Sequence, residues 1–169
     1  MDQPIDRDNT VRERIVLELV RRLKAMDPDQ GDVIAWNEVI RHRLEDLSDE
    51  RVAGDVCAVF DTGETYDYLA SCTECTLTIQ VEWWARVEAG DDGAALMERI
   101  RGNLYAMLSR ESQLTEHGTQ RALTKLVRPV RYDRDVDGPR VDYGGAFLEL
   151  TVIYRHRISD PHSLVGGST

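Results

Sequence analysis

Residues 75–88, CTLTIQVEWWARVE, alternate between apolar and polar side chains. The odd-numbered positions, from Cys75 through Ile79 to Val87, are apolar, whereas most of the even-numbered positions are polar. Because successive side chains of a β-strand point to opposite faces, this period of two predicts a strand with one buried face and one face in water. The stretch is about twice as long as a usual strand. It therefore predicts a sheet as a main layer of the fold.

A second strand of this kind is predicted at residues 144–157, GGAFLELTVIYRHR. The positions expected to face the core are Ala146, Leu148, Leu150, Val152 and Tyr154. The other face carries Glu149 and Thr151 and ends in Arg155 and Arg157. We expect the strand to belong to the core where it begins and to offer a charged contact surface where it ends.

Two amphipathic helices are predicted, at residues 9–26 and 94–110, because apolar side chains recur there every three or four positions. Thr10 and Glu13 have the spacing of a capping box, and Asp92 is the expected N-cap of the second helix. Shorter strands are predicted at 33–40, where a short helix is the alternative, and at 55–60, followed by a turn at 61–64. A further strand is predicted at residues 123–132, and Pro129 predicts that it is an edge strand or an interrupted one.

These elements predict the α+β class, a mostly antiparallel sheet with two main helices packed on one face. Residues 10–158 are expected to form a single domain. A flexible N-terminal arm is expected at 1–9 and a mobile C-terminal tail at 159–169. No apolar run approaches the length that spans a bilayer, and the polar N-terminus does not suggest a secretory signal.

The charge of the chain is strongly negative, with a formal net value of −10. Residues 121–157 hold eight basic and five acidic side chains, which makes this segment +3 and the remainder −13. A chain this acidic is a poor candidate for wrapping nucleic acid. The uneven distribution is either ordinary surface variation or a pair of patches that meet between two copies of the chain.

Cysteine usage does not predict a disulfide framework, because the chain has only three cysteines. Cys72 and Cys75 form a CxxC, but it precedes a strand, and neither a second pair nor a histidine pair completes a zinc site. We expect Cys75 to face inward on the strand and Cys72 to lie in the loop before it. No metal and no cofactor are predicted.

Two short motifs suggest chemistry but are incomplete. Residues 133–138, DRDVDG, match the first half of a calcium loop, whereas Gly144 stands where the bidentate glutamate belongs. A solvated turn is the favoured interpretation. Asp61 and Glu64 in DTGE could act as paired carboxylates, although an aspartic protease needs a second copy of this motif. A small metal-dependent or aspartic-type enzyme is a remote alternative, and no catalytic residue is assigned.

Adjacent tryptophans on the first strand must point to opposite faces. Trp83 lies in the apolar row and is assigned to the core. Trp84 falls on the polar face, where an exposed tryptophan is a candidate for a subunit contact. The alternative is that the N-terminal arm or a loop covers this face.

The order of these elements resembles the tail terminator proteins, also called minor tail or tail-completion proteins, of long-tailed bacteriophages. The resemblance covers about residues 10–158. It rests on RERIVLELVRRLKAM, on the DTGE strand end, on TLTIQVEWWARVE, on ALMERIRGNLYAML and on the closing GGAFLELTVIYRHR. A head–tail connector or neck protein of the same particles is the alternative.

The resemblance implies a structural protein without enzymatic activity. Such proteins form a hexameric ring that caps the tail tube, stops its polymerisation and provides the surface that joins the head. The implied partners are further copies of the chain, the tail tube protein and the head–tail connector, with no membrane and no sequence-specific nucleic acid. The implied location is the head-proximal end of the virion tail, after assembly in the host bacterial cytoplasm.

A ring joins two different patches of one chain. The predicted interface residues are Trp84, Arg86, Asp61, Glu64, Arg155 and Arg157. We expect the three arginines to contact acidic groups of a neighbouring copy, in residues 44–55 and 61–67.

Overall fold

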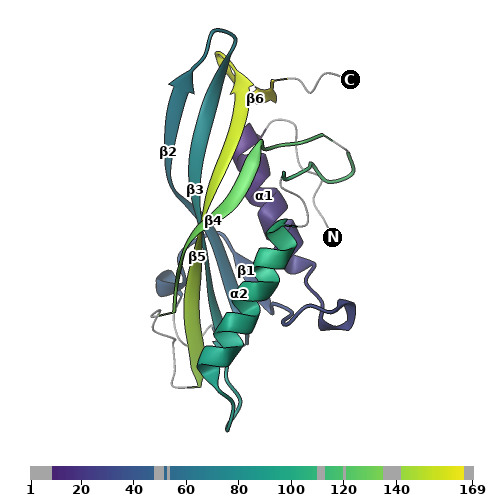
Figure 1. Cartoon of the computed structure of the whole chain (residues 1–169), viewed down its shortest axis with the longest axis vertical. Coiled ribbons are helices and arrows are strands. Elements are labelled where there is room, and N and C mark those ends of the chain that lie inside the picture. The colour runs from purple at the N-terminus through teal and green to yellow at the C-terminus, as the bar shows by residue number, and fades with distance from the viewer. Residues whose placement is uncertain are drawn as a thin grey trace.

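The structure is a computed structural model, and it describes residues 9–47, 52, 54–109, 113–119, 121–134 and 142–165. Two α-helices and a sheet of six strands make up this part of the chain (Figure 1). The helices are α1 (Val11–Lys24) and α2 (Gly93–Ser109). The strands are β1 (Glu38–Ile40), β2 (Val56–Tyr68), β3 (Cys72–Arg86), β4 (Leu126–Asp133), β5 (Tyr143–Arg157) and β6 (Asp160–Leu164).

The strands lie in the order β1-β2-β3-β5-β4, and β6 pairs with the end of β5. All pairings are antiparallel except that of β1 with β2, so the sheet is mixed. The two long strands predicted from their alternation, β3 and β5, are neighbours at the centre of the sheet. Strand β4 lies at an edge, as Pro129 predicted, and its register shifts between Pro129 and Arg131.

Three sequence predictions about the ends of strands need correction. The DTGE motif is not a turn: β2 continues through Asp61 and Glu64 to Tyr68, with an irregularity between Asp61 and Gly63. Cys72 is not in a loop, because it is the first residue of β3 and is buried. The segment assigned to a C-terminal tail contains β6, whose Leu164 is buried. In each case pairing with a neighbouring strand extends the element beyond its local pattern.

The main core lies between the helices and one face of the sheet. Ile15 and Leu19 of α1 and Ile100 of α2 belong to the same buried cluster as Leu77 of β3 and Leu150 of β5. The inward-facing set predicted for β5 is buried throughout. Burial of this apolar surface is the main force that stabilises the fold, at about 25 cal/mol per Å².

A second, smaller buried cluster contains Trp84 and corrects the prediction that this side chain is exposed. Only 5% of Trp84 is accessible, and it belongs to a cluster with Leu44, Val52, Val56 and Tyr143. Leu44 and Val52 lie in the connection between β1 and β2. The alternative expectation, that a loop covers this face, is therefore correct: the β1–β2 connection covers Trp84, which is a core residue.

Local capping fixes where the helices begin. The Thr10 hydroxyl accepts a hydrogen bond from the Glu13 N–H at 3.2 Å, as the capping box predicted. The Asp92 carboxylate accepts hydrogen bonds from the N–H groups of Ala94 and Ala95 at the start of α2. Each cap satisfies amides that the first helical turn leaves without an intrahelical partner.

Candidate interaction surface

The outer half of the β2–β3 hairpin forms one end of the molecule, and its turn lies beyond both helices (Figure 1). Tyr66, Tyr68 and Leu69 are 50%, 79% and 41% exposed there, and Ile158, which follows β5 at the same end, is 48% exposed. The two segments are neighbours because Cys72 pairs with Arg157. Apolar side chains that gather at one exposed end mark a candidate contact surface.

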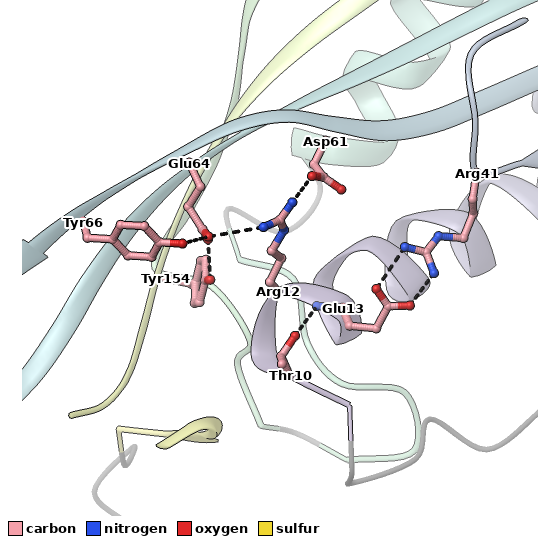
Figure 2. Close-up of polar contacts among 8 residues, drawn as sticks. All are labelled: Thr10, Arg12, Glu13, Arg41, Asp61, Glu64, Tyr66 and Tyr154. Carbon is pink, nitrogen blue, oxygen red and sulfur yellow. Dashed lines mark hydrogen bonds and ion pairs between the residues drawn. The ribbon is translucent and has the colours of Figure 1, made fainter. Parts of the chain in front are cut away.

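An acidic pair on β2 is held against the first turn of α1 by Arg12 (Figure 2). The Arg12 guanidinium is hydrogen-bonded to the Asp61 carboxylate and lies 3.5 Å from a carboxylate oxygen of Glu64. Burial acts to lower the pKa of Arg12, but the hydrogen bond and charge of Asp61 outweigh it and raise that pKa. The two carboxylates of DTGE therefore serve as ion-pair partners of Arg12 within the chain.

Two tyrosines complete this cluster by donating hydrogen bonds to Glu64 (Figure 2). The Tyr66 hydroxyl donates to one carboxylate oxygen at 2.5 Å, and the buried Tyr154 hydroxyl donates to the other. Burial and the bond to Glu64 raise the pKa of Tyr154, while the pKa of Tyr66 is raised mainly by its bond to Glu64. Glu64 of β2 thus contacts both α1, through Arg12, and β5, through Tyr154. Only 6% of its side chain is accessible.

A second ion-pair group lies on the opposite face of the hairpin. Glu74 of β3 accepts hydrogen bonds from Lys125 at 2.8 Å and from Arg155 of β5 at 2.7 Å. These two cations lower the pKa of Glu74. Arg155 was predicted to contact a neighbouring copy, but in this structure its partner is a residue of the same chain.

Basic side chains also follow the edge strand β4. Arg128 and Arg131 are exposed and lie on the same face of the sheet, because they pair with Thr151 and Glu149 of β5. Arg131 lies 3.3 Å from the Asp133 carboxylate. Together with Lys125, these residues give the β4 edge a positive character, whereas β2 carries acidic side chains at the opposite edge.

Arg86 lies at the end of β3 that is remote from the hairpin turn. Its guanidinium is 3.7 Å from the Asp142 carboxylate, and its backbone N–H donates a hydrogen bond to the Asp55 carboxylate at 2.7 Å. Burial raises the pKa of Asp55, and the bond from Arg86 partly offsets this. The six predicted interface residues are therefore not one patch: Asp61, Glu64, Arg155 and Arg157 share the hairpin half of the sheet, while Trp84 and Arg86 lie at the other end.

Sequence reasoning missed Arg12, Tyr66 and Tyr154 as members of the acidic cluster. The sequence separation between Arg12 and Asp61 is 49 positions, so no local pattern connects them. One weak indication was available: Arg12 lies on the polar side of the first predicted helix, and Asp61 and Glu64 were singled out as a pair of carboxylates.

No group of three or more metal-ligating side chains is present among the residues that the structure describes. Within the same residues, all three cysteines are buried and free, and burial raises the pKa of Cys57 and Cys75. Most of the calcium-like motif at 133–138 lies outside the described residues. No helix of the described chain is long and apolar enough to cross a bilayer.

Comparisons with known proteins give a likeness in structure but none in sequence. No protein-family model matches the chain, and no curated protein matches it in sequence. Among solved structures, the chain is similar to the sheath/tube terminator of an extracellular contractile injection system, PVC, in its extended state, determined by cryo-EM. The TM-score is 0.40 and the sequences are 10% identical; the match covers 91% of this chain and 62% of that chain.

Proposed function

We propose that this chain is a structural tail terminator of a long-tailed phage or a related tail-like particle. It would form a ring, expected to be hexameric, that caps the tail tube, stops its polymerisation and offers the joining surface for the head. We propose no enzymatic role and no cofactor.

The observation that carries this proposal is the projecting half of the β2–β3 hairpin. Ten residues of β2, Val59–Tyr68, extend beyond the segment that β1 pairs with. The end of this hairpin presents tyrosines to solvent. Aromatic side chains with little conformational freedom are enriched at protein interfaces, so this end suits contact with another subunit or with the tube.

The charge distribution supports assembly into a ring. A closed ring uses heterologous contacts, in which one patch meets a different patch of the next copy. In the strand order β1-β2-β3-β5-β4, the acidic strand β2 lies toward one edge of the sheet and the basic strand β4 forms the other edge. A single chain therefore carries two unlike and complementary surfaces, as such a contact requires.

The proposal is tested by assembling particles without this protein and measuring their tails by electron microscopy. A terminator predicts tails longer than those of the complete particle, because nothing stops tube growth. Tails of normal length that fail to join heads would identify a head–tail connector instead. Normal tails that join heads would contradict both roles.

A further inference from the structure

Strand β2 leaves a long backbone edge without a partner strand in the described part of the chain. Strand β1 pairs with β2 only at Val56–Ala58. From Val59 to Tyr68 the only described strand that pairs with β2 is β3. An unpaired edge is a template for a further strand, and folded proteins usually protect it. Here the edge has no proline and no lysine, and its irregularity between Asp61 and Gly63 lies outside residues 64–68.

The register shows which backbone groups point outward from this edge. At the hairpin turn the Leu69 N–H donates to the Cys72 carbonyl oxygen at 2.9 Å. In an antiparallel pair, successive residues alternate between bonding across the pair and pointing away from it. The N–H and C=O groups of Tyr68, Tyr66 and Glu64 therefore face away from β3, toward the open side.

Charge at this edge selects the strand that can join it. Asp61 and Glu64 are already paired with Arg12, so the acidic side chain that β2 brings to this edge is Asp67. Pairing with the β2 of another copy would bring two such like charges to one interface. The edge of β4 carries Lys125, Arg128 and Arg131. Asp67 pairs with Glu74 and Arg128 pairs with Thr151, so the two side chains lie on the same face of the sheet. If β2 of one copy and β4 of the next are antiparallel, the two sheets form one continuous sheet whose faces match. Asp67 of one copy and Arg128 of the next then lie on the same face of that sheet.

We propose that the open edge of β2, residues 64–68, pairs with β4 of a second copy of this chain, so that the sheet of one copy continues into the next. This inference rests on the proposed assembly into a ring, and it names the backbone contact that joins neighbouring copies. Pro129 has no N–H to donate, so near that position the ladder depends on the donors of β2 and the carbonyl groups of β4.

The first test compares Tyr68→Pro with Tyr68→Val in the full-length protein. Proline removes an outward N–H, whereas valine removes only the aromatic side chain and keeps the strand propensity. Loss of one such bond is expected to raise the dissociation constant between copies about fivefold to tenfold, measured by light scattering over a concentration series. Circular dichroism verifies that both variants keep the wild-type fold.

A second test does not depend on proline. Asp67→Arg and Arg128→Asp are each expected to weaken association, and a mixture of the two single variants is expected to restore contact between unlike copies. Amide exchange at Tyr66 and Tyr68 is also expected to slow as the concentration of the wild-type protein rises. Exchange that is independent of concentration, or association that none of these substitutions changes, overturns the pairing.

The two proposals fail in different ways. If Tyr68→Pro associates as tightly as Tyr68→Val while tails lacking the protein are overlong, the terminator role stands and the β2–β4 pairing is wrong. If tails have their normal length while the substitutions weaken association, the pairing stands and the terminator role is wrong.

Discussion

Replacing Trp84 with alanine is expected to destabilise the monomer. This substitution distinguishes a buried Trp84, as in the structure, from an exposed Trp84 in a subunit contact, as the sequence predicted. Trp84 is 5% exposed and belongs to the cluster with Leu44 and Val56. Truncating a buried tryptophan to alanine costs about 3–5 kcal/mol. Its indole N–H has no hydrogen-bond partner among the described residues, and removing such a donor returns about 1 kcal/mol or more.

The expected net loss for Trp84→Ala is therefore about 2–4 kcal/mol of unfolding free energy, a large share of a typical domain's stability. Trp84→Phe keeps much of the apolar contact and removes the unpartnered donor, so its loss is expected to stay below about 1.5 kcal/mol. Tyr68→Ala is the matched surface control, with an expected change within about 0.5 kcal/mol because the side chain is 79% exposed.

Urea unfolding followed by far-ultraviolet circular dichroism measures all three variants, because this signal does not depend on the tryptophan that is removed. The reasoning is refuted if Trp84→Ala unfolds at the wild-type urea concentration while its self-association falls. That result would place Trp84 in a subunit contact, as the strand alternation alone suggested.

Two further predictions concern ion pairs. Glu18 is fully buried, and although burial acts to raise its pKa, hydrogen bonds from Arg21 and Arg22 lower that pKa below the ordinary 4.5. The stability that the ionised Glu18 contributes is therefore present at neutral pH and lost as pH falls. Between about pH 6 and 3, Glu18→Gln should lose less unfolding free energy than the wild type, and an equal dependence of unfolding free energy on pH in the two proteins would contradict this. Arg155→Ala should lower the unfolding free energy by about 0.2–1 kcal/mol at low salt, and by less at high salt, because Arg155 pairs with Glu74 at the surface. The control Arg157→Ala removes an exposed side chain and should change the unfolding free energy little. Equal effects of the two substitutions in urea titrations would argue against the pair of Arg155 with Glu74.

The sequence predicted the elements that depend on local geometry. The alternation of β3 and β5, the stripes of both helices and the caps at Thr10 and Asp92 are properties of neighbouring residues, and the structure confirms them. The prediction of Pro129 at an edge was also correct, because a residue without an N–H cannot serve a central strand.

Only the tertiary structure decided which surfaces are covered and which charges are paired. Alternation places Trp84 opposite Trp83, but Leu44 and Val52, far away in the sequence, determine that it is buried. Likewise, Arg155 meets Glu74, and Arg12 meets Asp61 across 49 positions. A periodic pattern fixes the direction of a side chain relative to its own backbone, whereas burial and ion pairing depend on which distant segment packs against it.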